Sequence, residues 1–100
     1  MNIQITSRKF RAKDSLKSYI TKSLKSLEKL NDQILDVDVI LSFTHIKDSI
    51  KTVEINAQIP GKLLSVSSST DDFKKSVIDA RNKLERQLRK EKTKKLAKTR

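Results

Sequence analysis

Three segments in the middle of the chain alternate apolar and polar residues with the period of a β-strand. In residues 37–43 and 53–59 every second residue is apolar, and a weaker alternation covers residues 64–68. Because successive side chains of a strand point to opposite faces, such a segment buries one face and leaves the other in water. Residues 2–6 repeat the pattern over a shorter length, so we expect four strands that share one buried face.

Two further segments have the period of an amphipathic helix. The first lies between about residues 12 and 31, and the second begins after the Ser-Thr-Asp-Asp sequence of residues 69–72, where Ser or Thr caps a helix and acids suit its positive end. Their apolar stripes are Leu16, Ile20, Leu24 and Leu27, and Phe73, Val77, Ala80, Leu84 and Leu88. The predicted order is β-α-β-β-β-α, an α+β fold with both helices on one face of a four-stranded sheet.

The chain has the length of one domain, and turn signals separate its strands. Pro60-Gly61 predicts a type II turn, because proline fixes φ and glycine accepts a positive φ. The short polar segment His45–Ser49 predicts a hairpin connection. The second apolar stripe ends at Leu88, so we expect a folded domain over residues 1–90 and a basic tail, frayed or disordered, over residues 91–100.

Positive charge is concentrated at the two ends of the chain. The 23 lysines and arginines exceed the 12 acids, which gives a net charge of +11. Residues 1–30 carry +6, residues 31–70 carry −2 and residues 71–100 carry +7. A field of this sign attracts polyanions such as nucleic acids. Its segregation indicates a binding face built from the first and last thirds of the chain.

Helical spacing places many of these cations opposite the apolar stripes. Each helix has three of them at positions i, i+3 and i+7, which fall on one side. These residues are Lys22, Lys25 and Lys29 in the first helix, and Lys83, Arg86 and Lys90, continued by Lys94, in the second. If both helices cover one face of the sheet, two basic ridges run along the same side. Arg86 is the strongest candidate, because a guanidinium binds a phosphate through two parallel hydrogen bonds.

Other classes of function have weaker support. The chain has no cysteine and a single histidine, His45, so thiolate zinc sites and histidine-rich metal sites are not expected. Asp36 and Asp38 share one face of a strand, which leaves a metal-dependent nuclease as a minor alternative to two solvated carboxylates. We therefore expect no catalytic residue, metal, cofactor or small-molecule substrate.

Membranes and single-stranded bases are also poor candidates as partners. The longest apolar run is residues 39–41, and the N-terminal residues 1–4 do not resemble a secretory signal, so we expect a cytoplasmic protein. Phe43 and Phe73 lie on predicted core faces, and Tyr19 lies at a core edge. Without exposed aromatic rings, binding by base stacking has little support, and recognition by backbone charge and shape is favoured.

Residues 83–90 contain the run Lys-Leu, one variable residue, Arg-Gln-Leu, one variable residue and Lys. A second pattern lies near the N-terminus and consists of Met1, Ile3, Ile5, Leu16, Tyr19, Lys22, Leu24, Leu27 and Lys29. With the order β-α-β-β-β-α, these runs resemble the ribosome hibernation-promoting factor family, which includes ribosome-associated inhibitor A. The sequence departs from the family's pattern at Ser7, Lys13, Lys74 and Ile78, all outside the 83–90 run.

The resemblance implies a fold similar to a double-stranded-RNA-binding domain with an extra first strand. It also implies a non-enzymatic translation inhibitor that occupies the decoding channel of the small ribosomal subunit and contacts its ribosomal RNA. Because the chain ends at Arg100, the resemblance is to the short form, without an additional C-terminal domain. The alternative is a module that binds structured RNA without a ribosomal address. If the RNA contacts of the family are transferred to this sequence, they fall on Lys22, Lys25, Lys29, Lys83, Arg86, Arg89, Lys90 and Lys92.

Overall fold

The computed structural model describes residues 1–30, 33–44 and 50–98, with side chains for these residues apart from Thr44 and 92–98. The elements in chain order are β1 (Asn2–Ser7), α1 (Asp14–Lys25), the 3₁₀ turn η1 (Ser26–Lys29), β2 (Asp36–Thr44), β3 (Ile50–Ile59), β4 (Lys62–Thr70) and α2 (Phe73–Lys98). This order confirms the predicted β-α-β-β-β-α arrangement. The first helix ends as a 3₁₀ turn at Lys29, slightly earlier than the sequence predicts.

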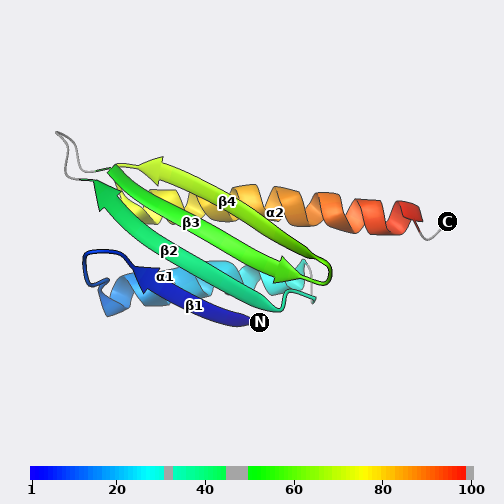
Figure 1. Ribbon diagram of the computed structural model, residues 1–100, viewed down its shortest axis with the longest axis horizontal. Helices are drawn as coiled ribbons and strands as arrows, with labels where there is room; N and C mark the ends of the chain where they lie inside the picture. Colours follow the sequence, from blue (N-terminus) through cyan, green and yellow to red (C-terminus); the bar gives the residue numbers. More distant parts are fainter. Residues whose placement is uncertain (31–32, 45–49, 99–100) are drawn as a thin grey trace.

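The four strands form one mixed sheet in the order β1-β2-β3-β4. β1 pairs with β2 in parallel, and the other two pairings are antiparallel. A parallel pair requires a crossover connection, which α1 provides. Figure 1 shows α1 and α2 side by side on the same face of the sheet, both starting at the same end of the molecule. The predicted two-layer fold is therefore confirmed.

The core lies between the sheet and the two helices. The inward positions of β2 and β3 are the odd-numbered residues, as the alternation predicts, and the stripes of both helices close over them. The fully buried side chains include Ile20, Leu24, Leu27, Val37, Val39, Leu41, Val53, Ile55, Val77, Leu84 and Leu88. Burial of apolar surface on this scale, at about 25 cal/mol per Å², is the main stabilising contribution to the fold.

The turn between β3 and β4 has the backbone that the sequence predicts. Gly61 adopts a φ of +76°, in the left-handed region that favours glycine, and the turn places Ile59 opposite Lys62. The predicted hairpin segment, residues 45–49, lies outside the described residues.

The start of α2 differs in detail from the prediction. The cap is Asp72, whose carboxylate accepts a hydrogen bond from the backbone N–H of Lys74 at 3.3 Å, while its carbonyl oxygen accepts one from Ser76 at 3.0 Å. The Thr70 hydroxyl oxygen accepts a hydrogen bond from the Asp72 N–H at 3.1 Å. The threonine therefore shapes the turn before the helix, and the aspartate caps it.

At its other end α2 continues as helix to Lys98, past the predicted domain boundary at residue 90. Its last turns extend beyond the sheet (Figure 1). The last buried residue of the stripe is Leu88, where the sequence places the end of the core. The division of the chain into a domain of residues 1–90 and a tail of residues 91–100 stays a prediction.

Candidate nucleic-acid interface

The solvent-facing side of the sheet, called here the outer sheet face, carries acidic and neutral residues. It consists of the outward strand positions Asn2, Gln4, Thr6, Asp36, Asp38, Ile40, Ser42, Thr52, Glu54, Asn56, Gln58, Leu63, Ser65, Ser67 and Ser69. Among these described positions there are three carboxylates and no lysine or arginine. The cations that the structure describes therefore lie elsewhere, and the outer sheet face offers little attraction to a polyanion.

The three predicted cations of the first helical segment lie on the opposite side of the molecule. Lys22 and Lys25 belong to α1 and Lys29 ends η1, and all three are exposed. The helix buries Ile20 and Leu24 against the sheet, so its opposite side points away from the sheet. None of the three lysines forms an ion pair with another described side chain, so their charges are uncompensated locally.

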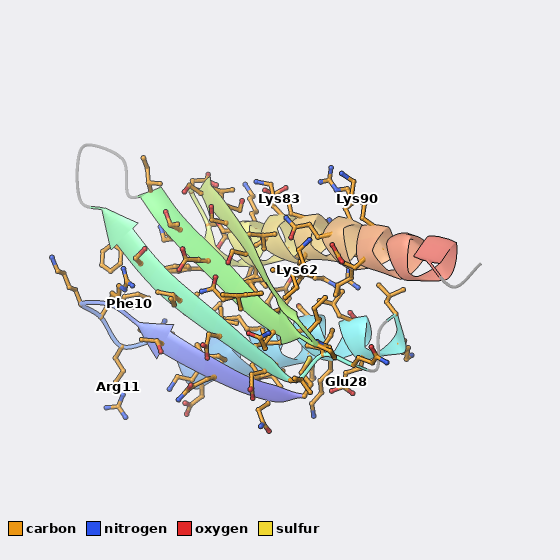
Figure 2. All side chains as sticks on the ribbon, turned by 45° about the vertical axis from the view of Figure 1, so that its right-hand side comes forward. Phe10, Arg11, Glu28, Lys62, Lys83 and Lys90 are labelled. Carbon is orange, nitrogen blue, oxygen red and sulfur yellow. The ribbon has the colours of Figure 1, made fainter. Side chains whose placement is uncertain are left out.

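The predicted cations of α2 are also exposed, but their surroundings differ. Lys83 and Lys90 project from the side of α2 that faces away from α1 (Figure 2). The Lys83 ammonium donates a hydrogen bond to the Ser67 carbonyl oxygen at 3.0 Å and lies 3.4 Å from the Asp79 carboxylate. Lys83 is thus partly neutralised, whereas Lys90 makes no ion pair within the described part of the chain.

The two arginines of this group lie further around the helix. Arg89 approaches Glu85 at 3.9 Å, which weakens its field. Arg86 forms no ion pair with a described residue, and helical spacing places it between Arg89 and Lys90 on the side away from the sheet. The side chain of Lys92 lies outside the described ones. Five of the eight predicted residues therefore present uncompensated charge on the helix layer: Lys22, Lys25, Lys29, Arg86 and Lys90.

Arg81 connects the two helices, a role that its place in the sequence does not reveal. Its Nε donates hydrogen bonds to the Ser23 carbonyl oxygen and the Ser26 hydroxyl, both at 3.1 Å, and its Nη2 donates to the same hydroxyl at 2.7 Å. Glu85 lies 3.6 Å from Nη1. Because Ser23 and Ser26 flank Lys25, this contact fixes the spacing between the cations of α1 and those of α2.

We expect Arg81→Ala to lower the free energy of unfolding by about 1–3 kcal/mol, since three hydrogen bonds between the helices are lost. Arg81→Lys is expected to recover less than half of the loss, because an ammonium cannot reproduce the planar contact with both acceptors. Urea denaturation of the two variants measures both effects. Stabilities equal to that of the unsubstituted chain would show that the contact does not hold the helices together.

Asp79 forms a polar cluster at the edge of α2. The buried Ser68 hydroxyl donates a hydrogen bond of 2.6 Å to Asp79 Oδ2, and Lys83 lies on the other side of the carboxylate. The hydrogen bond from Ser68 is the main cause that lowers the pKa of Asp79 from its usual value of 3.8. A hydrogen bond from Lys83 and the positive charges of Lys83 and Arg86 also lower this pKa. Desolvation of the carboxyl group acts in the opposite direction and raises it.

A carboxyl group with a lowered pKa in the folded state stabilises the fold above its unfolded pKa, and this contribution disappears as the pH falls through the lowered value. We therefore expect Asp79→Asn to be less stable than the unsubstituted chain at about pH 6, with the difference shrinking as the pH falls below 3.8. Urea denaturation across this pH range tests the expectation. A difference that stays constant with pH would exclude the ionised carboxylate as its source.

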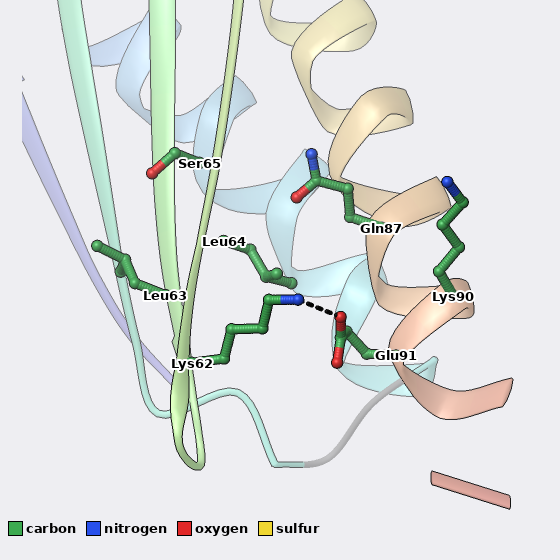
Figure 3. A pocket seen from close by; sticks show the side chains of 7 residues that line it. All are labelled: Lys62, Leu63, Leu64, Ser65, Gln87, Lys90 and Glu91. Carbon is green, nitrogen blue, oxygen red and sulfur yellow. Dashed lines mark hydrogen bonds and ion pairs between the residues drawn. The ribbon is translucent and has the colours of Figure 1, made fainter. Parts of the chain in front are cut away.

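A shallow hollow of about 340 Å³ lies between the start of β4 and α2 and is shown in Figure 3. The Lys62 ammonium and the Glu91 carboxylate form an ion pair of 2.6 Å across it. Lys90 and Gln87 line the same hollow. Because Glu91 already neutralises Lys62, the hollow adds little positive charge to the interface, and Lys90 remains its only lining cation without an ion pair among described residues.

The residues considered for metal or base binding lie apart from the cations. Asp36 accepts a hydrogen bond from the Asn2 amide at 3.2 Å, and Asp38 lies exposed beside it on the outer sheet face. In the described ranges no three Asp, Glu or His side chains are placed to share a metal ion. His45 lies outside those ranges. Neither helix, over its described length, is long and apolar enough to cross a membrane.

The aromatic residues pack as the sequence predicts. Phe10 contacts Phe43 edge-on with ring centroids 5.1 Å apart and stacks on Phe73 at 5.3 Å. Tyr19 is half-buried at the core edge, and the Lys74 ammonium lies 5.5 Å from the centre of its ring. The candidate interface is therefore a charged surface with few exposed rings, which suits a phosphate backbone better than single-stranded bases.

Comparison with curated proteins finds two relatives named ribosome hibernation promotion factor. The protein of Deinococcus radiodurans is 28% identical over 92 residues, which cover 90% of this chain and 48% of the relative. The protein of Bacillus subtilis is 30% identical over 94 residues, which cover 94% of this chain and 50% of the relative. The chain therefore spans about half the length of the curated relatives it matches.

Solved structures extend the similarity to the whole fold. A ribosomal subunit interface protein from Coxiella burnetii superposes with a TM-score of 0.85 at 28% identity, covering 93% of this chain and 99% of that one. The N-terminal domain of Thermus thermophilus Protein Y gives a TM-score of 0.81 at 27% identity, with 90% and 98% covered. The model of the family described as Sigma 54 modulation protein / S30EA ribosomal protein matches residues 3–96. As the run at residues 83–90 predicts, the chain belongs to this family of ribosome hibernation and subunit interface proteins.

Proposed function

We propose that this chain is a ribosome hibernation factor that binds the small ribosomal subunit and blocks translation without catalysis. The cations of α1 and α2 contact ribosomal RNA, and the body of the domain fills the decoding channel, where messenger and transfer RNA otherwise pass. In this proposal the protein acts in the cytoplasm and needs no cofactor. The names of its relatives support the ribosomal partner, since two of them are ribosome hibernation promotion factors.

The observation that carries the proposal is the separation of charge between the two faces. Uncompensated cations lie on the helix layer, and the outer sheet face carries carboxylates without described cations. Such a molecule has a preferred orientation toward a polyanion, because one face attracts it and the other repels it. A surface of this kind binds phosphates and releases their counterions, so its affinity falls steeply with salt.

A competition experiment separates this proposal from the alternative of a module that binds any structured RNA. The chain is bound to purified small subunits at physiological salt, and an excess of generic duplex RNA is added before sedimentation. We expect the chain to stay with the small subunits and to inhibit translation of a reporter messenger RNA in a cell-free system. Removal of the chain by the duplex RNA would contradict a specific ribosomal address and favour the alternative.

A further inference from the structure

The loop between β1 and α1 carries a third group of cations that the two helices do not include. Its residues 8–13 hold four of them without an acid: Arg8, Lys9, Arg11 and Lys13. All four side chains are exposed, and none makes an ion pair or hydrogen bond with a described side chain. Figure 2 shows Arg11 extending away from the sheet. The nearest carboxylate along the chain is Asp14, in the first turn of α1.

This loop is held in a defined shape by the two uncharged residues within it. Phe10 inserts between Phe43 of β2 and Phe73 of α2, and Ala12 is buried in the core. The Arg8 N–H donates a hydrogen bond of 2.9 Å to the Leu41 carbonyl oxygen. With these anchors alternating between the cations, the charged side chains project from a fixed backbone, which reduces the entropy lost when they bind a partner.

Lys9 shows that the backbone of the loop is constrained. It adopts a φ of +65°, the left-handed region in which a residue with a side chain is strained and glycine is not. A lysine at this position therefore costs stability that a glycine would not. Strained residues of this kind concentrate at functional sites, where the side chain serves a purpose other than folding.

The position of the loop distinguishes it from the helix-borne cations. It lies at the end of the molecule where α1 and α2 both begin, so the positive ends of two helix dipoles add to its charge (Figure 1). Phe10 of the loop stacks on Phe73, and Arg86 lies 13 residues further along α2, which amounts to about 20 Å. Phosphates that contact this loop therefore lie well apart from those at Arg86 and Lys90.

We propose that the β1–α1 loop is a separate RNA-contact element that binds a second segment of ribosomal RNA backbone through Arg8, Lys9 and Arg11. This inference rests on the proposed function, since it assigns the loop to the same RNA partner. Phosphodiester groups are the chemistry that fits it, because the site offers clustered charge and guanidinium donors but no exposed ring for a base.

The test compares two variants of equal net charge in binding to purified small subunits. Arg8→Gln with Arg11→Gln removes two cations from the loop, and Gln4→Glu with Leu63→Glu adds two acids to the outer sheet face. We expect the affinity of the loop variant to fall about tenfold, and the slope of log affinity against log salt concentration to become shallower by about 1–2. We also expect this variant to lose one of two hydroxyl-radical footprints on the RNA. The control is expected to keep its slope and both footprints.

Lys9→Gly separates binding from folding, because glycine relieves the backbone and removes the charge. We expect a melting temperature no lower than that of the unsubstituted chain, together with weaker binding. Wild-type affinity, slope and footprints for the loop variant would overturn the inference. In that case the proposed function is retained if the variant Arg86→Glu with Lys90→Glu fails to bind in the same assay. Normal binding by that variant as well would contradict both the inference and the proposed function.

Discussion

Replacing Arg86 and Lys90 with glutamate is expected to abolish co-sedimentation of the chain with small ribosomal subunits. Both side chains are exposed on α2 and form no ion pair with a described residue, so their charge is available to RNA. Each lost phosphate contact makes the salt dependence shallower by about 1, and the reversed charges add repulsion. We expect the affinity to fall by about 100-fold or more, with little change in thermal unfolding, as is usual for surface substitutions. Lys83 is left in place because it contacts Asp79 and Ser67.

A control of matched net charge shows whether the position of the charge matters. Arg86→Gln with Lys90→Gln and Gln4→Glu with Leu63→Glu each lower the net charge by two, the first on the helix layer and the second on the outer sheet face. We expect the first pair to weaken binding about tenfold and the second to have a small effect, because charges beyond about 10 Å are screened at 0.1 M salt. Equal effects of the two pairs would mean that only overall charge drives binding.

Leu84→Ala is expected to have the largest effect on stability. Leu84 is fully buried at the centre of the α2 stripe, close in sequence to the candidate interface residues Lys83 and Arg86. Removing a buried leucine side chain costs about 2–5 kcal/mol through lost transfer free energy and the cavity left behind. In a domain of this size we expect the melting temperature to fall by about 10–25 °C. Circular dichroism during heating and urea denaturation measure the loss.

Ile78→Ala is the matched control, because Ile78 lies on the same helix with 45% of its surface exposed. Its substitution is expected to change stability by less than about 1 kcal/mol. A similar loss for the two variants would contradict the assignment of Leu84 to the core and of Ile78 to the surface. It would also place the cations of α2 on a different side of the helix from the one described.

The main features of the fold follow from local patterns in the sequence. The alternation in residues 37–43 and 53–59 predicts both strands and their buried faces, because a strand repeats every two residues. The dipeptide at residues 60–61 predicts the turn, and the structure confirms the positive φ of Gly61. The exposed positions of Lys22 and Arg86 follow from the 3.6-residue helical repeat in the same way. These features depend on residues close together in the chain.

Other features depend on how distant segments meet, and no local pattern reveals them. Arg81 reaches Ser23 and Ser26, which are more than 50 residues away in sequence, only because the two helices pack side by side. The contact of Lys83 with Ser67 requires α2 to lie against β4. The ion pair of Lys83 with Asp79 can be predicted from the sequence, because a spacing of four residues is typical of such pairs on a helix.

The composition of the β1–α1 loop predicts its positive charge but not its rigidity. Its four cations without an acid mark residues 8–13 as a basic segment, but a flexible connector and a rigid contact element have the same composition. What distinguishes them is the packing of Phe10 between two rings from β2 and α2. That packing appears only when three segments that are about 30 residues apart in sequence meet in the fold.

A cryo-electron microscopy map of the chain bound to the small ribosomal subunit would decide whether the helices face the RNA, because it shows which face touches it. We expect α1 and α2 to lie against ribosomal RNA in the decoding channel, with Arg86 and Lys90 at phosphate groups. The outer sheet face, with Asp36, Asp38 and Glu54, is then turned away from the RNA. A map in which the strands contact the RNA and the helices face solvent would exclude the proposed orientation.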